Sequence, residues 1–191
     1  MKNFKKQVKN VAMLLALGLG MHVTTQAQEV EFGIKAGALY NMPSYGNKAV
    51  SDSDSKFGFQ AGVFARTTEK LYVEGELAFS SFKSTYTLES KKFAPTFYQL
   101  NLPLQIGYRV VDTDKMVLRT SIGPQFNYNL KANSANGKVD YKKLNYDGFV
   151  NIGTDIDQFS IDLRYNHAIN KTSNELESRN RMIGLSLGYR F

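Results

Sequence analysis

Apolar side chains occupy every second position through most of residues 30–191. Alternation with a period of two is typical of a β-strand whose two faces meet different surroundings. In the clearest segment, Tyr98, Leu100, Leu102 and Leu104 alternate with polar or small residues. A sustained apolar stripe with the 3.6-residue period of a helix is missing, so the sequence predicts an all-β chain with almost no helix. The pattern recurs eight times, at residues 30–40, 57–66, 71–80, 98–110, 116–128, 146–156, 159–169 and 182–191.

The connections between these segments alternate between long and short. The long ones are 41–56, 83–95, 130–145 and 170–181, and the short ones are 67–70, 111–115 and 157–158. An antiparallel meander gives this order when all its short turns lie at one end. Outer-membrane barrels have this asymmetry, with short periplasmic turns and longer extracellular loops.

The residues between the apolar positions decide which face points outward. A soluble eight-stranded barrel such as a lipocalin encloses a small-ligand cavity and must present its polar face to water. Here that face is rich in glycine, as at Gly33, Gly62, Gly107 and Gly153, and small residues suit a crowded interior. The segments run about 9–13 residues, long enough for tilted strands to cross a bilayer. The sequence therefore predicts an eight-stranded antiparallel up-and-down transmembrane β-barrel. Aromatic residues near the segment ends are typical of an interfacial girdle: Tyr40, Phe57, Tyr98, Tyr108, Tyr128, Tyr146 and Tyr189.

The first 27 residues predict a cleaved secretory signal peptide, followed by a barrel domain at residues 28–191. A lysine-bearing start is followed by an apolar run at residues 11–20 and by Thr25-Gln26-Ala27, with small residues at 25 and 27. This is the order of a signal peptide and its cleavage site. The apolar run is too short for a membrane anchor, which needs about 20 residues.

Composition excludes several kinds of site. The chain has no cysteine and only two histidines, His22 and His167, so a disulfide framework, a cysteine zinc site and a multi-histidine metal site are not expected. We expect no cofactor. The formal net charge of +7 at first suggests a soluble, nucleic-acid-binding domain. Four of the lysines belong to the signal peptide, however, and an exported barrel has no access to nucleic acid.

The polar face carries six basic and six acidic residues along the segments. Charges inside a narrow barrel must be paired, because an isolated buried ion costs several kcal/mol. An eight-stranded barrel is just wide enough for its own side chains, so we expect a filled lumen; an ion or proton pathway is the alternative. Pro124 lies in the middle of a segment, where a proline cannot donate a hydrogen bond to the neighbouring strand, and it therefore predicts a bulge at Gly123-Pro124. Pro103 lacks the same donor in the middle of its own segment. The predicted lumen charge network is Lys35, Arg66, Glu74, Glu76, Arg109, Arg119, Asp155, Asp162, Arg164 and Arg190.

The final strand and two earlier segments resemble a known family. Leu185, Leu187, Tyr189 and Phe191 resemble the C-terminal signal by which the barrel-assembly machinery recognises its substrates. Together with Phe32-Gly-Ile-Lys-Ala-Gly37 and the Leu-x-Leu-Pro-Leu stretch starting at Leu100, they make the chain similar to the PorT-like outer-membrane β-barrels of Bacteroidetes-type Gram-negative bacteria. The resemblance implies an integral outer-membrane protein. The member that gives the family its name is linked to protein secretion.

The long loops are basic, with 12 Lys or Arg against 6 Asp or Glu. Such a rim suits the phosphates of lipopolysaccharide or acidic surface polymers. The sequence therefore predicts a non-enzymatic outer-membrane barrel whose loops contact the cell surface or a partner. One alternative is an accessory subunit of a secretion system. The other is a lipid A-modifying enzyme, for which His167 would be the base; Ile169 replaces the serine of the deacylase pattern, and Ser173, Glu175 and Glu177 lie in the next loop.

Overall fold

The structure is a computed structural model that describes residues 29–46, 50–88, 91–133, 141–173 and 177–191. The predicted signal peptide and its cleavage site lie outside these residues. Within them, no helix is long and apolar enough to cross a membrane.

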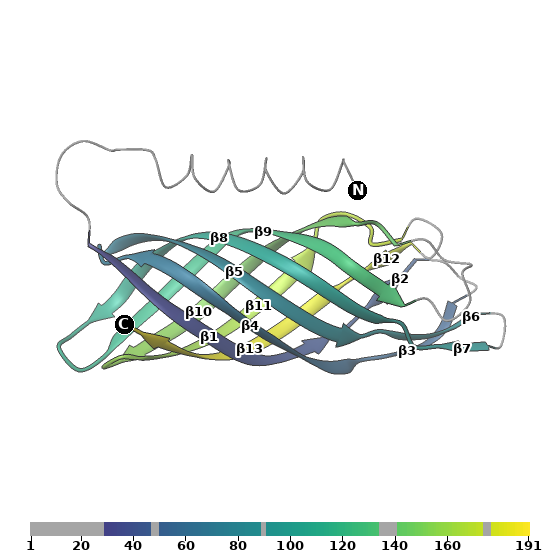
Figure 1. Cartoon of the computed structure of the whole chain (residues 1–191), viewed down its shortest axis with the longest axis horizontal. Coiled ribbons are helices and arrows are strands. Elements are labelled where there is room, and N and C mark those ends of the chain that lie inside the picture. The colour runs from purple at the N-terminus through teal and green to yellow at the C-terminus, as the bar shows by residue number, and fades with distance from the viewer. Residues whose placement is uncertain (1–28, 47–49, 89–90, 134–140, 174–176) are drawn as a thin grey trace.

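The fold is a closed barrel of antiparallel strands (Figure 1). Each strand pairs with its predecessor in the barrel, and the last strand pairs with the first, for example at Ile34 and Tyr189. The eight-stranded antiparallel barrel predicted from the alternation is confirmed. Its strands are β1 (Val30–Asn41), β4 (Lys56–Thr67), β5 (Leu71–Lys83), β8 (Thr96–Asp112), β9 (Val117–Asn133), β10 (Leu144–Ile156), β11 (Phe159–Ala168) and β13 (Arg181–Arg190).

One end of the barrel, the long-loop end, carries additional strands where the sequence predicted only loops (Figure 1). The pair β2 (Ser44–Tyr45) and β12 (Ser178–Arg179) joins the first long connection to the last. A three-stranded sheet is formed by β3 (Val50–Asp54), β6 (Thr85–Leu88) and β7 (Lys91–Phe93). These strands pair across different connections and are very short, so no single segment shows the alternation that would predict them. The opposite, short-turn end holds the C-terminus and the tight turn with Asp157 at a φ of 50°.

The two faces of the barrel wall have opposite polarity. Outward positions carry large apolar side chains that are mostly exposed, such as Phe57 at 75% and Leu187 at 64%. Inward positions carry polar and charged side chains that are buried, such as Arg66 at 1% and Arg119 at 0%. A water-soluble barrel would have the reverse arrangement, so the lipocalin alternative is excluded. The wall is built to contact hydrocarbon and to keep its polar groups in the lumen.

The predicted bulge at Gly123-Pro124 is wrong. Pro103 pairs with Gln125 and Ile106 pairs with Ile122, so the register of β8 against β9 is the same on both sides of the proline. The register shifts of this pair lie elsewhere, at Tyr98/Gln99 and Arg109/Val111. Because Gly123 has no side chain, its strand can approach β8 closely. A Cβ at this position would fall on the carbonyl oxygen of Leu104.

Candidate functional site

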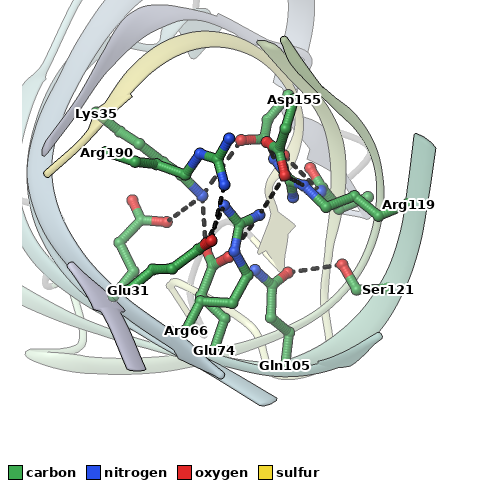
Figure 2. A network of polar contacts seen from close by, with 12 residues as sticks. Glu31, Lys35, Arg66, Glu74, Gln105, Arg119, Ser121, Asp155 and Arg190 are labelled. Atoms are coloured by element: carbon green, nitrogen blue, oxygen red, sulfur yellow. Dashed lines mark hydrogen bonds and ion pairs between the residues drawn. The ribbon is translucent and has the colours of Figure 1, made fainter. Parts of the chain in front are cut away.

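Six charged side chains form a closed ring across the lumen (Figure 2). Acidic and basic groups alternate around it, so that every ion has two partners of opposite sign. The ring runs from Arg66 to Asp155 (3.3 Å), Arg119 (3.0 Å), Asp162 (2.9 Å), Lys35 (3.2 Å), Glu74 (2.5 Å) and back to Arg66 (3.7 Å).

The bond between Arg119 and Asp155 is bidentate. Nε and Nη2 of Arg119 donate to the two carboxylate oxygens of Asp155, each at 3.0 Å. Both side chains are inaccessible to solvent, at 0% and 1% exposure. This geometry satisfies a guanidinium more fully than a single contact does. Gly153 leaves the space for it, because a Cβ there would lie 2.7 Å from Cζ of Arg119.

Two further ion pairs extend the ring. On the side of Arg66, Glu31 accepts from Arg190 at 2.8 Å and lies 3.5 Å from Arg66. On the side of Lys35, Glu76 accepts from Arg164 at 2.9 Å. The complete ionic plug therefore has five cations and five anions, and its formal charge is zero. It consists of Glu31, Lys35, Arg66, Glu74, Glu76, Arg119, Asp155, Asp162, Arg164 and Arg190.

The plug differs from the predicted network at two residues. Arg109 lies apart, and its ion pair is with Asp112 at the short-turn rim, at 3.7 Å. Glu31 takes its place in the plug, although the prediction omitted it from the network. The alternation placed both on the inward face, but it could not tell which one reaches the ring. The other nine predicted residues belong to the plug.

A layer of amides and hydroxyls lies next to the plug on the side of the long-loop end. Within it, Gln99 donates to Asn129 at 2.9 Å, and Asn101 donates to Ser80 at 2.7 Å. A cavity of about 10 Å³ lies in this layer, close to the lower limit for holding one water molecule. Its polar lining includes Gln60, Ser80, Gln99, Asn101, Gln125 and Asn166.

An apolar cap closes the lumen above the amides, at the long-loop end. The rings of Phe82 and Phe97 stack at a centroid distance of 5.3 Å, and Met182 completes the buried cluster. Tyr141 packs edge-on against Phe97 at 4.9 Å. This cap was not predicted from the sequence, because Phe82 and Phe97 fall just outside the predicted segments 71–80 and 98–110. The sequence did carry a signal for them: continuing the alternation of segments 71–80 and 98–110 by one or two residues places both rings on the inward face.

Tyrosines continue the cap into the long-loop sheets. The hydroxyl groups of Tyr86 and Tyr141 lie 3.2 Å apart, and Tyr45 lies 2.8 Å from the hydroxyl of Ser84. Burial raises the pKa of Tyr45 to about 12. The lumen is thus filled in turn by the ionic plug, the amide layer and the apolar cap.

The described part of the long-loop surface carries exposed cations. Some of them are paired with acids: Asp54 bridges to Lys56 and Lys92 at 3.7 and 3.4 Å. Lys171 donates to Glu177, and this bond and the lysine's charge lower the pKa of the Glu177 carboxyl. Exposed cations with no acidic group within 4.0 Å among the described residues include Lys83, Lys142, Lys143, Arg179 and Arg181. Lys48, Glu89, Lys138, Asp140 and Glu175 lie outside the described residues, and for Asp52, Lys91 and Lys131 only the backbone is described.

The candidate catalytic residues do not meet. His167 points outward from β11, whereas Ser173 is fully buried. A base must lie within hydrogen-bond reach of its nucleophile, and among the described residues no such bond joins His167 to a serine. Glu177 is engaged by Lys171. The residues of the predicted C-terminal assembly signal, Leu185, Leu187, Tyr189 and Phe191, all lie on the exposed face or end of β13.

A closed antiparallel barrel with an apolar exterior and a charged, filled interior defines an integral outer-membrane β-barrel protein. The chain belongs to the outer membrane protein beta-barrel domain family, whose match covers residues 26–174. This membership implies the outer membrane as its location. A comparison with curated proteins gives no match.

Solved structures support the fold. OprG from Pseudomonas aeruginosa is 13% identical, with a TM-score of 0.57 over 86% of this chain and 97% of that one. Ail from Yersinia pestis, in complex with the heparin analogue sucrose octasulfate, is 17% identical, with a TM-score of 0.51 over 85% and 99% of the two chains. The outer membrane enzyme PagL is 11% identical over 83% and 98% of the chains; its TM-score of 0.43 carries no inference about activity. At these identities the likeness concerns the fold alone.

Proposed function

We propose that this chain is a non-enzymatic outer-membrane barrel that acts through its extracellular surface, and that residues 1–27 direct its export and are removed. The filled lumen is the observation that carries the proposal. With a neutral ionic plug, an amide layer and an apolar cap in series, and a cavity of only about 10 Å³, the interior offers no room for a substrate. The long-loop end is the extracellular end, as in other barrels of this class.

The non-enzymatic assignment rests on the placement of His167 and Ser173. One lies on the outer wall and the other is buried at the barrel mouth. A lipid A hydrolase needs these two groups in contact. The placement therefore disfavours the enzyme alternative.

Charge supports anionic partners on the cell surface. Lys142 and Lys143 lie next to each other before β10, and both side chains are exposed. A cationic rim raises the local concentration of polyanions such as lipopolysaccharide phosphates and acidic polysaccharides. The complex of Ail with a sulfated heparin analogue shows that a protein of this fold has been solved with a polyanion.

Reversing the charge of the extracellular rim should weaken polyanion binding. We expect Lys142→Glu/Lys143→Glu to bind a sulfated polysaccharide at least about tenfold more weakly than the wild type, with a weaker salt dependence, because exposed charges act over a Debye length. Binding of the detergent-solubilised full chain to heparin at several salt concentrations measures this. The matched control is Lys70→Glu/Lys115→Glu, which makes the same charge change on exposed residues of the short-turn end.

Equal losses in the two variants would show that total charge, and not the extracellular rim, determines binding. Undetectable binding of the wild type at low salt would contradict the proposal itself. Both variants should keep the heat-modifiable gel mobility of a folded barrel, because none of the four side chains faces the lumen.

A second proposal is that the protein is an accessory subunit of a secretion system. It is supported by the PorT-like segment Leu100-Asn-Leu-Pro-Leu-Gln-Ile-Gly-Tyr108, which forms most of β8. Affinity purification of the full chain from detergent-solubilised membranes tests this proposal. Recovery of secretion-machinery subunits in stable amounts would support it, and recovery of the barrel alone would count against it.

A further inference from the structure

His167 and Arg181 form a basic pair on the outer wall of the barrel. They are direct cross-strand partners at the long-loop end of β11 and β13. Both side chains are exposed on the lipid-facing side. Within the described residues, neither has a side-chain hydrogen bond or an ion pair.

The wall below this pair carries only aliphatic and aromatic side chains on β11 and β13. The outward partners between the pair and the short-turn end are Phe159/Tyr189, Ile161/Leu187, Leu163/Leu185 and Tyr165/Ile183. Eight residues separate His167 from Phe159, which at about 3.3 Å per residue and a tilt of 35–45° is a height of roughly 20 Å. The apolar band of such barrels is about 25 Å tall. Measured from Phe159, the basic pair therefore lies within about 5 Å of the distal edge of this band, within reach of the headgroups for long side chains.

The wall beside the pair lacks a side chain. His167 pairs with Gly148 of β10, which in turn pairs with Pro124 of β9. At Gly148 the position of a Cβ meets only Cδ1 of Ile169, at 3.9 Å. An acyl chain can thus lie against the backbone of β10, directly next to His167 and one strand away from Arg181.

We propose that His167 and Arg181 bind the phosphate of an outer-leaflet glycolipid whose acyl chain lies over Gly148. Arg181 supplies the charge and two parallel N–H donors that suit a phosphate. His167 supplies a ring N–H donor from the neighbouring strand. Both side chains reach the headgroup region from an apolar wall, so the ligand is one that is itself held in the membrane. This site rests on the proposed extracellular orientation of the long-loop end.

The test compares lipid binding by single-residue variants of the full chain. Native mass spectrometry of the barrel in detergent with diphosphorylated lipid A should show binding weakened about tenfold by Arg181→Ala, the scale of one charge-assisted interaction. Loss of the ring N–H donor in His167→Ala should weaken it several-fold. The matched control is Lys83→Ala, which removes an exposed cation from the same end of the barrel but from β5, on another wall.

Three further binding measurements identify the ligand. Dephosphorylated lipid A should bind the wild type about as weakly as diphosphorylated lipid A binds Arg181→Ala. Inorganic phosphate should not compete at equal concentration, because it lacks the acyl chain. Gly148→Leu should weaken lipid binding while leaving the two basic groups in place.

Two results would overturn the site: an equal loss in Lys83→Ala and Arg181→Ala, or equal binding of the phosphorylated and dephosphorylated lipids. These outcomes are separate from failure of the proposed function. Heparin binding through Lys142 and Lys143 tests the loops, whereas lipid A binding through Arg181 tests the wall, and either can fail without the other. All variants should be checked for heat-modifiable mobility.

Discussion

Replacing Arg119 with alanine is expected to destabilise the barrel by about 3–5 kcal/mol, the range measured when one partner of a buried ion pair is removed. Arg119 is fully buried and binds both Asp155 and Asp162. Without it, the plug would hold four cations against five anions, and two carboxylates would lose their closest partner. Because the three side chains are at most 3% exposed, the two carboxylates would lose these donors in a buried site, where unpaired charge is costly.

Urea unfolding of the barrel in lipid vesicles measures this change in free energy. Arg109→Ala is the matched control: Arg109 also faces inward, but among the described residues its one ion pair is with Asp112, at 3.7 Å and with 46% of that carboxylate side chain exposed. Pairs of this kind contribute about 0–1 kcal/mol. If the two variants lost equal stability, the closed ring would have no special role in holding the barrel together.

Replacing Gly123 with alanine should destabilise the barrel by about 3 kcal/mol or more, at the upper end of overpacking effects. The added Cβ would fall on the carbonyl oxygen of Leu104 and lie 2.9 Å from Cα of Gln105. These are backbone atoms of the neighbouring strand, so no side-chain rotation relieves the contact. The strands β8 and β9 would have to separate at this point.

Gly75→Ala is the control for this substitution. Gly75 lies on β5, on the opposite side of Leu104, and faces outward. A Cβ there meets only the Leu104 side chain, at 3.6 Å, so its effect should stay within about 0.5 kcal/mol. The same urea unfolding experiment compares the two. A small effect at Gly123 would mean that the strands are not in close contact there.

The sequence was sufficient to predict the barrel and its polarity. A strand places successive side chains on opposite faces, so the alternation around Leu100 and Leu102 identified the inward and outward sets directly. Connection lengths then separated the two ends. The short strands β3, β6 and β7 could not be predicted in this way, because each depends on pairing with a distant segment.

The ion pairs could not be predicted from the sequence, because they depend on the three-dimensional stagger of the strands. Lys35 of β1 contacts Glu74 of β5, although β4 lies between these two strands. Such a contact crosses the lumen and follows from the tilt and shear of the barrel, which the alternation does not encode. For the same reason, the alternation could not show that Glu31 belongs to the plug and Arg109 does not, because both lie on the inward face. The predicted bulge at Pro124 was wrong because the register of β9 against both β8 and β10 continues unshifted through the proline.

The conductance of single barrels in planar lipid bilayers reports whether the lumen is closed. The purified full chain, shown to be inserted by its heat-modifiable mobility, should give no long-lived conductance steps at neutral pH. The ionic plug and the apolar cap formed by Phe82 and Phe97 leave no continuous water path in the described lumen. Stable, reproducible open steps from the wild-type barrel would contradict this account and place its function inside the lumen.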